Sequence, residues 1–293
     1  MAKKQDLTIL LFLFVLLVVA AVAVAWLLGR GEQEEVIGGR GERVGLVEVR
    51  GVIVESEPVV RQLERFRKDR SVRAVVLRVD SPGGGVAASQ EIYQEVRRVR
   101  DSGKPIVCSM GSVAASGGYY IAVGCNKIVA NPGTTTGSIG VIAEIPRVDR
   151  LLDRLGVEIA VVKSGRYKDI GSPYREMTPD ERRLLQEWID DAYDQFLHTV
   201  SEERGIPVDS LRPVADGRVF TGRQAMKLGL VDTLGTLRDA ARLAARLAGS
   251  LEEPKLVRPV TRRISLWDVL FGKVKSLREL ARPWPKLKYQ WAG

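Results

Sequence analysis

Residues 73–110 read RAVVLRVDSPGGGVAASQEIYQEVRRVRDSGKPIVCSM. Arg73–Asp80 is rich in β-branched residues and predicts a strand, and a glycine-containing turn and a helix to about Arg100 follow it. Pro105–Met110 predicts a second strand. Both strands are apolar along most of their length, as is typical of a parallel sheet with helices on both faces. We therefore predict an α/β domain.

The sequence on either side extends this pattern. Upstream, Arg43–Glu55 (RVGLVEVRGVIVE) predicts one or two strands, and Ser56 precedes a helix with Pro58 near its first turn. Downstream, we expect further short strands at Lys127–Ala130 and Val157–Lys163.

The second half of the chain is predicted to be mostly helical. Thr178–Glu181 and Thr221–Gln224 have the capping-box pattern of a helix start, and Thr236 begins a third helix that ends near Gly249.

The N-terminus has the composition of a membrane anchor. Leu7–Gly29 contains no charged residue, and about 20 apolar residues suffice to span a bilayer as a helix. A cleaved signal peptide is the alternative, although its apolar region is usually only about 7–15 residues long. Lys3 and Lys4 favour a cytoplasmic N-terminus. We expect residues 1–6 in the cytoplasm, a span over 7–29, a linker over 30–43, an extracytoplasmic domain over 44–250, and a tail over 251–293.

The tail carries most of the net charge of +9 of this 293-residue chain. Lys255–Gly293 contains ten Lys or Arg and two acidic residues, so the rest of the chain is close to neutral. On a tethered protein, anionic lipid is a more natural partner for this tail than nucleic acid. Leu266, Leu270 and Val274 share one helix face, which fits an interfacial helix and equally a helix packed on a neighbouring subunit.

Four segments carry the candidate chemistry, in the order DSPGGG (80–85), GSVAASGGYY (111–120), TTTGSIGV (134–141) and SGRYKDIGSP (164–173). The first is a loop whose N–H groups are able to bind an anion, or a tight turn; a nucleotide site is excluded because no Gly-Lys-Ser/Thr follows. The second leaves Ser116 accessible at a helix start, although close packing of small residues explains it equally well in isolation. The third contributes hydroxyls, and the fourth contributes a candidate base.

A histidine-based mechanism is disfavoured. His198, the one histidine, falls on the polar side of its helix and is expected to be a solvated surface residue. A serine nucleophile then needs another base, and lysine serves when burial lowers its pKa from about 10.4 toward 7–8. One histidine and two separated cysteines, Cys108 and Cys125, make no zinc pattern. We expect these cysteines to be buried free thiols, with a disulfide as the alternative.

In their order and spacing the four segments resemble the signal peptide peptidase A family, and GRVFTGRQAMKLGLVD (217–232) is similar to it as well. The resemblance covers about residues 44–250. It implies a fold like Clp protease and the crotonases, a spiral of strand–strand–helix units, here preceded by one transmembrane helix. It also implies assembly into a homo-oligomeric ring.

The resemblance also assigns the site. Ser116 matches the nucleophile, Lys168 the general base, and Ser138 the serine that hydrogen-bonds the lysine. Gly83, Gly84 and Gly117 match the oxyanion-hole region. The activity implied is that of a membrane-anchored Ser–Lys endopeptidase that degrades signal peptides left in the bilayer, together with other apolar peptides, without a metal or organic cofactor. A peptidase that trims a membrane partner, a crotonase-like acyl-CoA enzyme and a non-catalytic membrane scaffold are the alternatives.

Overall fold

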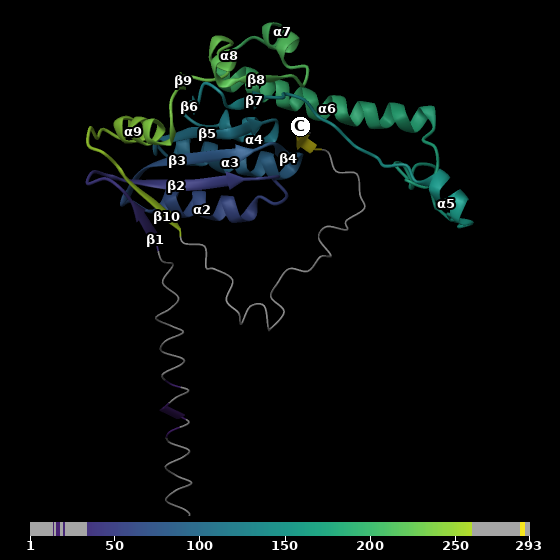
Figure 1. The fold of residues 1–293 in the computed structure, drawn as a ribbon, viewed down its shortest axis with the longest axis horizontal. Helices are drawn as coiled ribbons and strands as arrows, with labels where there is room; N and C mark the ends of the chain where they lie inside the picture. The colour runs from purple at the N-terminus through teal and green to yellow at the C-terminus, as the bar shows by residue number, and fades with distance from the viewer. Residues whose placement is uncertain (1–13, 15, 18–19, 21–33, 260–287, 291–293) are drawn as a thin grey trace, which may run out of the picture.

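The computed structural model describes residues 14, 16–17, 20, 34–259 and 288–290 (Figure 1). Within them the chain forms the predicted α/β domain. The main sheet has the strand order β1-β10-β2-β3-β5-β6-β9. These strands are β1 (Glu34–Ile37), β10 (Lys255–Pro259), β2 (Arg43–Arg50), β3 (Val72–Ser81), β5 (Ile106–Ala115), β6 (Lys127–Ala130) and β9 (Thr233–Leu234). All neighbours along this order are parallel except the β1–β10 pair, which is antiparallel.

The sheet is covered on both faces, as predicted. On one face lie α2 (Glu57–Lys68), α3 (Val86–Asp101) and α4 (Gly117–Ala122), whose apolar residues join a core that includes Leu63, Ile92 and Tyr119. On the other face lies α9 (Leu237–Leu247), which presents Ala240, Ala241, Ala244 and Ala245 to the sheet. Continuous apolar strands such as β3 therefore have both of their faces buried.

Short strands extend the sheet around the end of β5. The second half of β5 pairs in parallel with β7 (Thr135–Gly137), which pairs antiparallel with β8 (Val219–Thr221). The glycine segment forms β4 (Gly83–Gly85), against which β11 (Lys288–Gln290) runs antiparallel. Consequently the glycine-rich segments of the sequence collect at the carboxyl ends of β3 and β5.

The remaining helices are α5 (Asp149–Leu155), α6 (Pro179–Arg204), α7 (Val208–Leu211), a 3₁₀ turn (Arg212–Val214) and α8 (Gly222–Lys227). The capping boxes predicted at Thr178 and Thr221 are both formed, and Thr236 forms a third with Asp239. Figure 1 shows α6 projecting from the domain, with α5 at its far end away from the sheet. We call residues 142–178, which include α5 and lead to α6, the arm.

One predicted strand is wrong. Val157–Lys163 forms no strand, and its apolar side chains at Val157, Ile159 and Val161 are about half exposed. The segment belongs to the arm, where the described residues place no other strand beside it. Because a β-strand needs a neighbour for its backbone hydrogen bonds, strand propensity alone does not produce one here.

The sheet also extends beyond the expected borders of the domain. β1 lies in the segment expected to be a linker, and β10 lies in the segment expected to be the tail. Among the described residues no helix is long and apolar enough to cross a membrane. Most of the expected span over 7–29 and the predicted tail helix around Leu266–Val274 lie outside the described residues.

Candidate active site

Ser116 lies at the turn between β5 and α4, in a backbone conformation that is unusual for a residue with a side chain. Its φ is 53° and its ψ is −117°. In the described part of the chain only two non-glycine residues have positive φ, and they are Ser116 and Ser138. Such strained conformations collect at functional sites, because the surrounding structure must hold them in place. Ser116 is 1% exposed, so the accessibility predicted for it at the helix start is not found within the single chain.

The glycine segment lies directly beside this turn. Gly84 approaches the backbone of Ile53 so closely that a Cβ would fall 2.1 Å from the Ile53 carbonyl oxygen. Ile53 donates its N–H to the Gly83 carbonyl at 2.8 Å, and Gly85 donates to the Ile53 carbonyl at 2.8 Å. A Cβ on Gly118 would lie 2.9 Å from the Ser81 carbonyl oxygen. Glycine is therefore required where β4 packs on Ile53 and where α4 packs on the end of β3.

The candidate oxyanion donors differ in how they are engaged. The N–H of Gly83 donates to Ser81 Oγ at 3.1 Å, and Gly84 is paired with Tyr289 on the other edge of β4. Gly117 is the first residue of α4, so its N–H has no partner within the helix. The outer edge of β4 accepts an extended segment, because Tyr289 of β11 lies opposite Gly84.

Ser138 is brought next to Ser116 by the pairing of β5 with β7. Ala115 is in register with Gly137, and Ser116 donates its N–H to the Gly137 carbonyl at 2.8 Å. Ser138 has a φ of 50°, is 7% exposed, and donates its N–H to the Arg218 carbonyl at 2.8 Å. The two strained serines thus end neighbouring strands.

The neighbouring threonines of the same loop have a structural role. Thr134 Oγ1 donates to the Gly111 carbonyl and Thr136 Oγ1 to the Ala114 carbonyl, both at 2.7 Å. Their hydroxyls join β7 to β5. Ser138 therefore remains the hydroxyl of this loop that is best placed to orient a base.

Lys168 lies on the arm, apart from the other candidate residues. Its side chain is exposed. The loop around it is attached to the first turn of α6 on both sides. Arg166 binds Asp180 directly, and Asp169 binds Arg175, which in turn binds Glu181. α6 contacts α4 far down its length, where the rings of Tyr120 and Phe196 are 5.1 Å apart.

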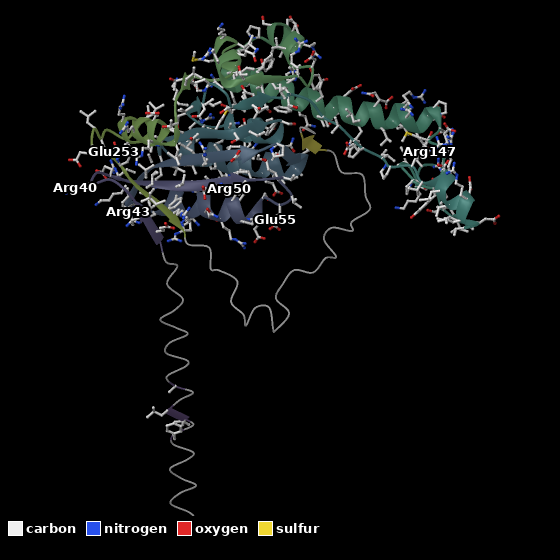
Figure 2. The ribbon with its side chains drawn as sticks, viewed as in Figure 1. Arg40, Arg43, Arg50, Glu55, Arg147 and Glu253 are labelled. Atoms are coloured by element: carbon white, nitrogen blue, oxygen red, sulfur yellow. The ribbon has the colours of Figure 1, made fainter. Side chains whose placement is uncertain are left out.

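From Glu181 to Phe196 the helix rises by about 22 Å, at 1.5 Å per residue. This is too far for a lysine side chain to bridge. Figure 2 shows how far the arm projects, with Arg147 at the opposite side of the view from Arg40, Arg43 and Glu253. Within one chain Lys168 and Ser116 do not come together.

An ionic network fixes the loop that carries Lys168. Asp169 accepts Lys163 Nζ on Oδ1 and Arg175 Nε on Oδ2, the latter at 2.9 Å. Arg175 also binds both carboxylate oxygens of Glu181. Hydrogen bonding from Arg175 and then from Lys163 lowers the pKa of Asp169 well below its usual range. Hydrogen bonding from Arg175 lowers the pKa of Glu181 to about 2.

The structure tests several sequence expectations about rival residues. His198 is exposed, and its ring contacts the Asp194 carbonyl of its own helix at 2.7 Å, which confirms it as a surface histidine. Cys108 and Cys125 are buried and free, as expected. Lys163 is bound to Asp169, so it is occupied in an ion pair. Among the described residues, no group of three or more His, Cys, Asp or Glu side chains is arranged to hold a metal ion.

Sequence reasoning missed Arg175, Glu181 and the Arg218 carbonyl. A signal for the first was present, since a carboxylate next to a proposed lysine base requires another cation to engage it. Arg175 is the arginine that follows in the same loop. The hydrogen bond from Ser138 to the Arg218 carbonyl is not predictable from the sequence, because every residue has a backbone carbonyl.

Comparison with known proteins gives a consistent set of matches. Residues 98–250 match Peptidase family S49, and residues 52–135 match the Clp protease family. A Synechocystis protein named as a protease is 44% identical over 238 residues, which cover 78% of this chain and 84% of the relative. An Enterococcus faecium protein named after signal peptide peptidase SppA is 37% identical over 216 residues, 69% of this chain and 63% of the relative. Protease 4 of Salmonella typhi is 40% identical over 195 residues, 67% of this chain and 31% of the relative.

Proposed function

Because the chain belongs to peptidase family S49 and is a serine peptidase, we propose that it works through a Ser–Lys dyad formed between two copies of the chain. Ser116 of one copy is the nucleophile, and Lys168 of a neighbouring copy is the general base. The observation that carries this proposal is the placement of the two residues: Ser116 lies in a strained turn between β5 and α4, whereas Lys168 lies on the arm.

The shape of the arm supports a partner copy. α6 has 26 residues and is therefore about 39 Å long, and its first turn carries the Lys168 loop away from the body of its own chain. Val157, Ile159 and Val161 form an exposed row of apolar side chains on the arm. Leu151 and Leu155 of α5, which are 57% and 66% exposed, add to this apolar surface. Apolar surface of this kind on a projecting segment is characteristic of subunit contacts. A head-to-tail contact of this kind forms a ring when the rotation between successive copies closes, and a ring is the assembly we propose.

The reaction follows from these placements. Neutral Lys168 takes the proton from Ser116 Oγ as that oxygen bonds to the carbonyl carbon of the peptide. The N–H groups of Gly84 and Gly117 stabilise the resulting oxyanion, and such donors are commonly worth about 2.7–4 kcal/mol each. The lysine returns the proton to the leaving amine as the C–N bond breaks. Water then attacks the acyl-enzyme, again with lysine as the base. Ser138 orients the lysine.

The substrates we assign are apolar peptides in the bilayer, with signal-peptide remnants foremost. The uncharged run Leu7–Gly29 would tether the domain beside the membrane, with the N-terminus in the cytoplasm. The edge of β4, on which β11 already lies, suits a substrate in extended conformation. A peptidase that trims one membrane partner protein would use the same site. Cleavage-product profiles on a signal-peptide mixture and on a folded membrane protein distinguish the two.

The assignment is tested with two lysine variants. Lys168→Arg should be nearly inactive, since guanidinium keeps its proton at working pH. Lys163→Arg is the matched control: it keeps the cation that binds Asp169 and should retain activity. A fluorophosphonate probe should add its mass to the peptide that contains Ser116 in the wild type. Full activity of Lys168→Arg would overturn the dyad, and labelling of a different serine would overturn the nucleophile.

A further inference from the structure

The arm places a carboxylate beside the proposed base, and this requires an explanation. Asp169 follows Lys168 directly in the chain. A free carboxylate within about 4–6 Å of a lysine ammonium group stabilises the charged lysine. The pKa of the lysine then rises by about 1–3 units. A lysine base must instead lose its proton. An unengaged Asp169 would therefore oppose the reaction that its neighbour performs.

In the structure both oxygens of Asp169 are engaged by other cations. Lys163 holds Oδ1, and Arg175 holds Oδ2 at 2.9 Å while its NH2 group contacts the Asp169 carbonyl at 3.4 Å. The Asp169 side chain is 13% exposed. Its carboxylate is thus turned into the loop.

Arg175 is itself held in place by the buried carboxylate of Glu181. Glu181 is 2% exposed, receives Arg175 on both oxygens, and accepts the Thr178 N–H at 2.9 Å within the capping box of α6. Lys163, Asp169, Arg175 and Glu181 together carry no net charge. At the same junction Asp180 is shared by Arg166 and Arg183, which leaves one positive charge over on the exposed start of α6.

We propose that Arg175, fixed by Glu181 and assisted by Lys163, is a positioning residue that holds Asp169 away from Lys168 and thereby lets Lys168 act as a base. The inference rests on the proposed Ser–Lys function and adds a group to it. Arg175 makes its contacts with Asp169, Glu176 and Glu181. It acts on the base by occupying the one carboxylate that is adjacent to it in the chain.

The pH profile of kcat/KM, measured on the assembled full-length protein with a soluble peptide, tests the proposal. In Arg175→Gln, Oδ2 of Asp169 is released to pair with Lys168, while Lys163 still binds Oδ1. The acidic limb of the profile should move to higher pH by about one unit or more. At pH values below the limb, kcat/KM should be roughly tenfold lower than in the wild type, and it should recover at higher pH. The Arg175→Gln, Asp169→Asn double variant should restore the wild-type limb, because the released carboxylate is gone.

Matched variants separate this effect from loss of structure. Arg166→Gln removes the ion pair to Asp180 in the same loop and leaves Asp169 bound to Arg175. The acidic limb of its pH profile should therefore stay at the wild-type pH. Arg175→Lys keeps a cation near Asp169 but loses the bidentate contact to Glu181, so its limb should lie between those of the wild type and Arg175→Gln.

A double variant as impaired as Arg175→Gln, or an unshifted limb in Arg175→Gln, would overturn the positioning role. An active Lys168→Arg enzyme in the same series would instead overturn the dyad itself. The two failures are therefore distinguishable.

Discussion

At the scale of single residues, the site is marked by backbone strain. Ser116 and Ser138 combine positive φ with burial, and each is hydrogen-bonded through its N–H to a neighbouring strand. Both were identified from the sequence, because small residues flank them and because the motifs resemble a known family. The strain itself was not predictable from the sequence. It arises from the strand pairing that forces each serine into its turn.

This strain predicts an order of stability among inactive variants. Ser116→Ala and Ser116→Gly should both lack peptidase activity, since each removes the nucleophilic oxygen. Glycine adopts a φ of 53° without the steric penalty of a Cβ, and such strain is worth about 1–3 kcal/mol. Ser116→Gly should therefore melt at a temperature at least as high as Ser116→Ala in a thermal unfolding scan. A clearly lower melting temperature for the glycine variant would argue against strain at this position.

At the scale of elements, local sequence patterns predicted helix starts and apolar strands correctly, but they did not predict which strands pair. The capping boxes at Thr178 and Thr221 were recognised because all of their atoms lie within four consecutive residues. β3, β6 and the start of β5 were found because they are continuously apolar. Val157–Lys163 has the composition of a strand, but the described residues place no other strand beside it. β1 and β10 pair across most of the sequence, and no local pattern indicates this.

The exposed row of the arm predicts a contact between copies. Ile159→Asp places a charge in the middle of this row, where Ile159 is 44% exposed in the single chain. Burying that charge at a subunit contact is unfavourable, so assembly and peptidase activity should fall together. Leu251→Asp, at an exposed position on the opposite side of the domain from the arm, is the control and should leave both unchanged. Sedimentation velocity with parallel activity assays measures the effect; normal assembly of Ile159→Asp would exclude this row from the interface.

Acid should loosen the attachment of the arm to α6. The folded pKa of Glu181 is lowered from 4.5 to about 2 by Arg175, so the stabilisation is complete above pH 4.5 and is lost as the pH falls toward 2. Hydrogen exchange in residues 166–181, corrected for intrinsic rates, should accelerate over that interval. Glu181→Gln should exchange rapidly already at pH 6. Exchange that is independent of pH in the wild type would show that Glu181 does not hold the arm.

At the scale of the whole molecule, the sequence predicted the candidate site residues but not the separation between them. The order of the motifs indicated that they serve one active site, and within one chain the fold brings together Ser116, Ser138, Gly84 and Gly117. Lys168 is excluded from this group by the length of α6 and by the ion pairs that attach its loop to the first turn of that helix. A sequence lists residues of one chain and does not state which copy supplies each of them.

Mixing two inactive variants tests the central claim most directly. Ser116→Ala retains Lys168, and Lys168→Ala retains Ser116, so neither has a complete dyad when it is assembled alone. If each dyad joins two copies, subunits dissociated, mixed in equal amounts and reassembled should recover about one quarter of the wild-type activity, the chance that an intact Ser116 faces an intact Lys168. Mixed assemblies that form, as shown by mass spectrometry, but remain without activity would contradict a dyad shared between copies.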